Sequence, residues 1–285
     1  MTVMETILQP GLINEIDQKI FYADIYWDKY FSADKRSIDI IQKLSGFQKL
    51  EQCATVLGAA TVSEAYELKE HVVEYKYIDS NTPYKKFINS GTIDRYLSLW
   101  SKKKMQYIKS SYNEPVILDK NIRLISQTRL NQAKDEKIII AGMTKCLECV
   151  YDTGEYLAAK STVIILKKNV DLKYLIGLLN SKLITFYFNN FFSSLSLAGG
   201  YLRVGPPQIK KIPIAIPSET LQKEIINHVK TISSITSGHN YCDDSEKQDY
   251  VSKIECKIDD LVYQLYGLTL EEIELVEKIS NIKGD

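Results

Sequence analysis

Short apolar runs, separated by turn-forming residues, dominate the chain between Val72 and Leu166. Runs rich in Val and Ile and bounded by Gly, Asp or Asn are typical of β-strands. Two of them, Cys149–Tyr151 and Tyr156–Leu166, flank Asp152-Thr-Gly, which predicts a hairpin. The other predicted strands are Val116–Leu118, Ile122–Ser126 and Lys137–Gly142, with a turn at Asp119-Lys-Asn before the second and a polar loop, Ser126–Gln132, after it.

A helical pattern replaces these runs from residue 171 onwards. Apolar residues three and four apart predict helices over 172–183, 218–232 and 249–266. Asp171 and Ser218 are suited to cap the first two, and Gly267 to end the third. Thr269 and Glu272 have the spacing of a capping box for a last short helix. The proline-rich stretch 205–217 is predicted to be extended.

These patterns predict an α+β protein with three parts. The first, 1–46, contains an aromatic cluster between Phe21 and Phe31, and we interpret it as a helical lead-in. A β-rich body over 47–217 and a C-terminal helical segment over 218–285 follow it. A length of 285 residues allows one or two domains with a sizeable core.

Charge is unevenly distributed, although the net charge is zero. Between Thr82 and Leu130 there are ten Lys and Arg against three Asp and Glu, whereas Tyr241–Asp285 holds five Lys against twelve Asp and Glu. The first segment, which we call the basic window, is able to offer a positive face to a polyanion. The alternative is that both segments are ordinary solvated surface.

The composition is that of a globular protein, with 45% hydrophobic and 25% charged residues. No pattern of a signal peptide or a membrane span is present, so no membrane partner is expected. Five Cys at irregular spacing fit reduced thiols, and a cytoplasmic protein is therefore expected.

Four stretches of the chain carry a family resemblance. They are Lys86–Tyr96, Tyr174–Phe188, the pair Gly199–Val204 and Ile209–Ile214, and Ile258–Ile273. In this order they closely resemble the TaqI-like C-terminal specificity domain, a target-recognition domain of restriction–modification adenine methyltransferases. They are also similar to one half of a type I specificity subunit. The resemblance spans roughly Phe47 to Ile279.

The resemblance implies both a fold and a function. The fold is a β-rich target-recognition body joined to helices that dock on a partner. The function is to direct an adenine methyltransferase domain or subunit to its site in double-stranded DNA, and homodimerisation through the C-terminal helices is a further possibility. The methyltransferase motifs themselves are missing: Gly205-Pro-Pro-Gln lacks the Asn or Asp before, and the aromatic residue after, the prolines. We therefore expect a non-catalytic module without a cofactor.

Candidate DNA contacts follow from the charge pattern and from hydrogen-bond geometry. Phosphate contacts are predicted for the basic window and near Gly199-Gly-Tyr, and base contacts where Arg, Gln or Asn lie on predicted loops. The alternatives are structural. Gly199-Gly could form a turn that places Tyr201 and Leu202 in the core, and Lys102–Lys104 could be a solvated loop. Arg129 could pair with Asp135, and Arg95 with neighbours of Asp94 or with the acidic C-terminal segment. The predicted phosphate contacts are Lys85, Lys86, Lys102, Lys103, Lys104 and Arg203, and the predicted base contacts are Arg95, Gln127 and Arg129.

Other kinds of site are weakly supported. Cys146 and Cys149 have the spacing of a zinc knuckle that His239 and Cys242 could complete, but a strand would place the two Cys on opposite faces. No arrangement of residues indicates catalysis, so neither a metal nor a catalytic residue is predicted. The alternative function is a non-catalytic assembly subunit that binds protein rather than DNA.

Overall fold

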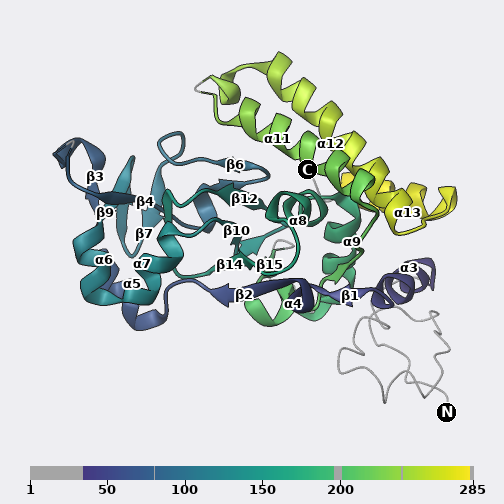
Figure 1. Ribbon diagram of the computed structural model, residues 1–285, viewed down its shortest axis with the longest axis horizontal. Coiled ribbons are helices and arrows are strands. Elements are labelled where there is room, and N and C mark those ends of the chain that lie inside the picture. The colour runs from purple at the N-terminus through teal and green to yellow at the C-terminus, as the bar shows by residue number, and fades with distance from the viewer. Residues whose placement is uncertain (1–34, 80, 196–200, 239, 283–285) are drawn as a thin grey trace, which may run out of the picture.

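The computed structural model describes residues 35–79, 81–195, 201–238 and 240–282. It shows a strand-rich body followed by C-terminal helices, which confirms the predicted α+β class (Figure 1). The aromatic cluster at 21–31, Gly199 and His239 lie outside the described residues, and the limits predicted for the three parts stay predictions. No described helix has the length and apolar character that crossing a membrane requires.

The first sheet is antiparallel and lies at the centre of the body. Its order is β12-β10-β14-β2. Successive side chains of a strand point to opposite faces, so Ile138 and Ile140 join the main core while Ile139 joins the core between the sheets. Burial on both faces explains the continuous apolar run of β10. The strands are β2 (Ala54–Gly58), β10 (Lys137–Ala141), β12 (Cys149–Asp152) and β14 (Thr162–Lys167).

The second sheet packs against the first through one face and against three helices through the other. Its order is β13-β4-β9-β3, with β13 and β4 parallel. Ile88 and Ala158 contribute to the core between the sheets, and Phe87 and Leu157 to the core under the helices. The elements are β3 (Val73–Glu74), β4 (Tyr84–Ile88), β9 (Pro115–Leu118), β13 (Tyr156–Ala158), α5 (Val62–Lys69), α6 (Asp119–Ile125) and α7 (Gln127–Lys134).

Helices cover the other face of the first sheet. Gly177 lets two of them approach closely, because a Cβ at this position would lie 2.6 Å from the side chain of Ile225. In Figure 1, α11 and α12 lie side by side and extend beyond the body. The helices are α3 (Lys35–Ser45), α8 (Leu172–Leu179), α9 (Lys182–Phe191), α11 (Glu219–Thr236), α12 (Ser245–Leu265) and α13 (Leu270–Ile282).

Short elements connect these layers. Pairing of β1 with β16 brings the first and last strands of the body next to each other. The short elements are β1 (Gln48–Lys49), α4 (Leu50–Cys53), η1 (Tyr75–Tyr77), η2 (Ser90–Thr92), β5 (Ile93–Asp94), β6 (Leu97–Ser98), β7 (Met105–Tyr107), β8 (Ser110–Tyr112), β11 (Met143–Thr144), η3 (Ser193–Leu195), β15 (Leu202–Arg203), α10 (Pro206–Ile209), β16 (Pro213–Ile214) and η5 (Tyr241–Asp243).

Two predictions about the body were wrong. The predicted strand Ile122–Ser126 belongs mainly to α6, and the predicted loop after it is α7. Ser126 ends one helix and caps the next, since its Oγ accepts a hydrogen bond from the backbone N–H of Arg129. The predicted hairpin on Asp152-Thr-Gly does not form, because β12 pairs with β10 and β13 pairs with β4. The turn connects the two sheets instead.

Predictions about the helical segment were closer. The helix expected over 172–183 is two helices, because Ser181 begins a new one by accepting from the N–H of Ile184. The capping box of Thr269 and Glu272 is confirmed. Gly267 ends α12 in the left-handed region, with φ +65. The proline-rich stretch is extended only in part, since it contains α10.

Candidate nucleic-acid interface

Loops from distant parts of the sequence meet at one end of the two sheets. The strands β4, β10 and β13 all stop there, and hydrogen bonds join the segments that follow them. Ser90 Oγ donates to Ser161 O at 2.8 Å and accepts from Gly142 N at 2.9 Å. Asn89 Nδ2 donates to Gln106 O of β7 at 2.8 Å. We call this the loop end, made of residues 89–92, 104–111, 142–145, 159–161 and 201–203.

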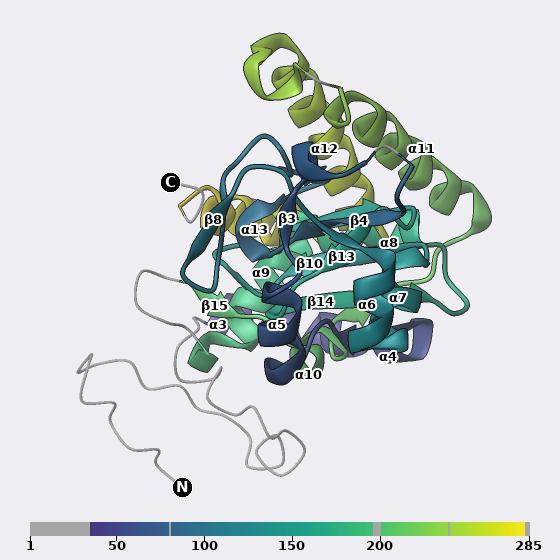
Figure 2. The same ribbon diagram turned by 90° about the vertical axis from the view of Figure 1, so that its left-hand side faces the viewer.

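A small β-ribbon belongs to the loop end. Strand β11 pairs antiparallel with β15, so that Met143 lies opposite Arg203 and Thr144 opposite Leu202. The backbone N–H of Val204 also donates to Gly142 O at 2.9 Å. Leu202 is buried in the main core, which fixes the ribbon to the body. In Figure 2, β8 and β15 lie towards the left, whereas α6 and α7 lie towards the right.

The loop end carries only positive charges. Its segments contain no Asp or Glu, whereas the segments at the opposite end of the sheets contain both. The nearest acidic residues in the sequence, Asp94, Glu114 and Glu148, lie just outside it. This arrangement is suited to a polyanion. The cations of the loop end are Lys104, Lys109, Lys145, Lys160 and Arg203, and the acids at the opposite end are Asp79, Asp119, Asp135, Glu136, Asp152 and Glu155.

Three of the predicted phosphate-binding lysines make contacts within the protein. Lys85 Nζ donates to Gly154 O at 2.6 Å. Lys86 Nζ lies 2.7 Å from a carboxylate oxygen of Glu155 and 5.3 Å from the ring centroid of Trp100. Lys102 Nζ donates to the carbonyls of Thr236 and Gly238, at the end of α11. These contacts hold the three ammonium groups against protein acceptors, and the Glu155 carboxylate also offsets the charge of Lys86.

The predicted base contacts also bond to other groups of the protein, although Gln127 remains exposed. Arg129 pairs with Glu64 at 3.0 Å, not with Asp135, and Gln127 donates to Asn131 in the same helix. Arg95 lies in the β5–β6 turn and pairs with Glu255 of α12 at 3.3 Å, which is the alternative involving the acidic segment.

The remaining predicted contacts are exposed. Lys103 and Lys104 lie on the surface, as does Arg203, and the last two belong to the loop end. Sequence reasoning missed Lys145 and Lys160 because they lie outside the basic window. Lys109 lies inside the window but was not named as a contact. A useful signal was their position: Lys145 and Lys160 each follow the end of an apolar strand by two to four residues.

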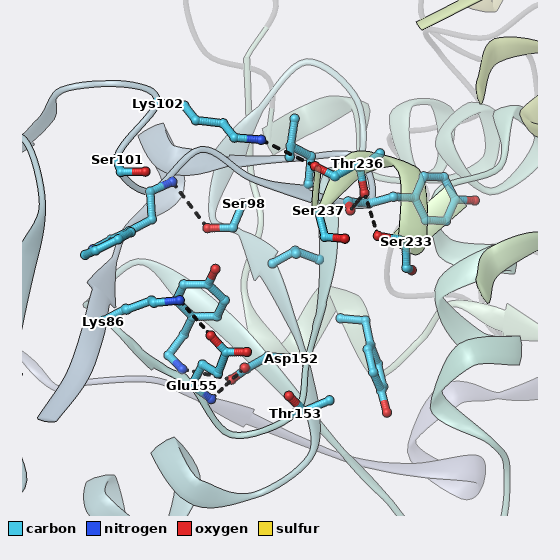
Figure 3. A pocket seen from close by; sticks show the side chains of 16 residues that line it. Lys86, Ser98, Ser101, Lys102, Asp152, Thr153, Glu155, Ser233, Thr236 and Ser237 are labelled. Carbon is cyan, nitrogen blue, oxygen red and sulfur yellow. Dashed lines mark hydrogen bonds and ion pairs between the residues drawn. The ribbon is translucent and has the colours of Figure 1, made fainter. Parts of the chain in front are cut away.

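A cleft of about 540 Å³ separates the body from the end of α11. Figure 3 shows Lys86 and Lys102 on its walls, both bonded to protein groups. Hydroxyl groups make up much of the remaining polar lining, from Ser98, Ser101, Ser233, Thr236 and Ser237. With Glu155 beside Lys86, the cleft has mixed charge, so it fits a polyanion less well than the loop end does.

The described residues do not support the other sites. Among them, no group of three or more His, Cys, Asp or Glu is placed to hold a metal ion. Cys149 is buried on β12, and its backbone N–H and carbonyl bond to Asn180. Burial raises the pKa of the Cys146 thiol to about 11, which disfavours the thiolate that zinc requires.

Comparison with known proteins gives a family match and two distant structural likenesses. A search of curated proteins found no match. The type IIL restriction-modification enzyme MmeI in complex with DNA has a TM-score of 0.48 and 12% identity, covering 83% of this chain and 36% of that one. The type IIG restriction endonuclease BpuSI has a TM-score of 0.45 and 9% identity, and the match covers 93% of this chain and 37% of that one. This chain thus spans little more than a third of either enzyme.

The family match covers the structural elements that build the loop end. Residues 75–214 match the family model of the TaqI-like C-terminal specificity domain. This range includes β4, β10 and β13, the three loops that follow them, and the β11–β15 ribbon. The part of the chain that builds the loop end is therefore similar to the TaqI-like C-terminal specificity domain, and the match covers just under half of the chain.

Proposed function

We propose that this chain recognises a target sequence in double-stranded DNA for a restriction–modification system, and that the loop end is its DNA-binding surface. The observation that carries the proposal is the set of five cations on loops free of carboxylates, in a domain of a specificity family. Cations that neutralise phosphates release bound counterions, and this supplies affinity for a duplex. Hydrogen bonds between the loops hold their backbones in place, which gives a defined support for the side chains that base recognition needs.

The proposal extends to partners and chemistry. We propose that the chain directs an adenine methyltransferase, with the C-terminal helices available for docking, and that it contributes recognition rather than catalysis. The purified chain alone is then expected to transfer no labelled methyl group from S-adenosylmethionine to duplex DNA. Transfer by the chain alone would contradict the non-catalytic part of the proposal.

Binding to duplex DNA as a function of salt tests the main proposal. The logarithm of the association constant should fall linearly with the logarithm of salt concentration, with a slope of about −0.9 for each phosphate contacted. Selection of bound sites from a random duplex pool should then return one motif. A chain that binds no duplex at low salt would favour the protein-binding alternative, and binding without a motif would remove the specificity role.

A further inference from the structure

The two faces of the β11–β15 ribbon differ in chemistry. Thr144 and Leu202 are buried, with exposed fractions of 3% and 5%, whereas Met143 is 49% exposed and Arg203 is exposed beside it. Cross-strand neighbours lie about 5 Å apart, so the outward face presents one guanidinium and one thioether together. No ion pair joins Arg203 to another described residue. This exposed pair has no evident role in folding.

The ribbon is held firmly at its base. Gly142, which begins it, is bonded through its N–H to Ser90 and through its carbonyl to Val204. The carbonyl of Lys145, which follows it, accepts from Asn189 Nδ2 of α9 at 3.2 Å. Val204 is buried in the main core. A side chain on such a support has a defined position, which recognition through paired hydrogen bonds requires.

Cations flank the ribbon on the adjoining loops. Lys160 is exposed next to Ser161, whose carbonyl is bonded to Ser90 of the same network. Lys145 follows β11 directly, and its Nζ lies 6.0 Å from the centroid of the exposed Tyr201 ring. A ribbon with a base-reading side chain and neighbouring cations matches the needs of groove recognition, in which phosphate contacts orient the protein and base contacts specify.

We infer that the β11–β15 ribbon enters the major groove of the target duplex and that Arg203 reads a guanine. The inference rests on the proposed function and names the element and residue that perform it. The major groove is about 12 Å wide and admits a two-stranded ribbon, and Arg pairs with guanine O6 and N7 through two hydrogen bonds. Met143 lies where its thioether contacts the methyl group of a neighbouring thymine. Lys145 and Lys160 contact phosphates on the two sides of the ribbon.

Site selection and salt titration with matched variants test this inference. Arg203→Ala should lose the preference at one motif position, lowering discrimination there roughly tenfold to a hundredfold. Arg203→Lys keeps the charge but loses the two-bond geometry, so it should relax the same position and leave the salt slope unchanged. Lys160→Ala should weaken all sequences alike and lower the slope by about one. The exposed Arg123 of α6 supplies the control, Arg123→Ala, which should change neither property.

The outcomes separate this inference from the proposed function. Wild-type chain that selects no motif would overturn both. A wild-type motif that Arg203→Ala leaves intact would overturn the inference alone and would assign base reading to other loops. Uniform weakening by Arg203→Ala, with every position preserved, would make Arg203 a phosphate contact and would also overturn it. Circular dichroism of each variant verifies that the fold is unchanged.

Discussion

The guanidinium of Arg95 lies 3.3 Å from the carboxylate of Glu255, and this contact joins the strand-rich body to α12. Arg95 occupies the two-residue turn between β5 and β6, where Tyr96 has a φ of 59 and is buried. The hydroxyl of Thr236, at the end of α11, donates to the carbonyl of Tyr96 at 3.1 Å. The turn is therefore inserted between the body and the α11–α12 pair, and Arg95 has a structural role there.

Removing Arg95 is expected to destabilise the fold. Arg95→Ala leaves Glu255 without its cation, and the side chains of the pair are only 28% and 19% exposed. Fully buried pairs lose about 3–5 kcal/mol when one partner is removed, so we expect about 2 kcal/mol here. Urea unfolding measures this change. The control is Lys223→Ala, which breaks the exposed pair with Glu219 and should cost less than about 0.5 kcal/mol. Equal effects of the two variants would contradict this assignment.

The carboxyl groups near this joint predict a pH dependence of stability. Burial raises the pKa of Glu148 to about 7, with a contribution from Asp94, and burial raises the pKa of Asp259 to about 6. An acid with a raised folded pKa binds more protons in the folded state, so the free energy of unfolding falls as pH rises from about 4 to about 7. For Glu148 the loss is up to about 3 kcal/mol.

Glu148→Gln should flatten that decline, because a neutral side chain has no proton to lose. Urea unfolding at several pH values between 4 and 8 provides the measurement. Glu246→Gln, at an exposed position of α12, is the control and should leave the decline unchanged. A Glu148→Gln profile that coincides with wild type would show that this carboxyl ionises without cost in the folded protein.

The sequence predicted those elements whose signals are local. The apolar run Lys137–Gly142 contains β10, and the capping box at Thr269 starts α13, because periodicity and caps depend on neighbouring residues. The strand predicted for Ile122–Ser126 was wrong because the prediction used only such local signals. A short β-branched run fits either a strand or a helix, and contacts of Ile122 with the core under α5, α6 and α7 decide between them.

The site could be predicted only in part, because its residues meet through tertiary structure. Ser90, Gly142 and Ser161 are far apart in sequence, and the parallel pairing of β13 with β4 brings two of their loops together. Charge counting along the chain included Lys85, which bonds to Gly154 O across 69 positions. It missed Lys160, which stands alone in the sequence. Arg203 was identified from its motif, although its position on a ribbon was not.

Close packing at Gly142 makes this residue a test of the loop end. A Cβ at position 142 would collide with the backbone carbonyl of Ser161, which cannot move without breaking its bond to Ser90. We expect Gly142→Ala to lower the free energy of unfolding by about 2–3 kcal/mol and to weaken DNA binding. Gly91→Ala is the matched control, since its Cβ would lie 3.4 Å from the Asn89 side chain. Unchanged stability of Gly142→Ala would contradict the described loop contact.

Two sets of lysines separate the basic window from the loop end as DNA-binding surfaces. The first set, Lys85, Lys86 and Lys102, comes from the part of the basic window that lies outside the loop end, and each of its members is bonded to a protein acceptor. The set from the loop end is Lys109, Lys145 and Lys160. Changing all three loop-end lysines to Ala removes three phosphate contacts, so the salt slope of duplex binding should flatten by about 2.7. The window set should flatten it by less than about 1, because those side chains already have partners.

The same two triple variants are also expected to differ in stability. Loss of Lys102 removes hydrogen bonds to the carbonyls of Thr236, the last residue of α11, and of Gly238 just beyond it. Loss of Lys86 leaves Glu155 without its cation. The window set should therefore lower the free energy of unfolding by about 1–2 kcal/mol. The loop-end set should leave it unchanged or raise it, since like charges are removed from one surface. If the window set flattened the salt slope more than the loop-end set, the DNA-binding surface would lie in the basic window instead. Equal flattening by both sets would mean that the surface includes both regions.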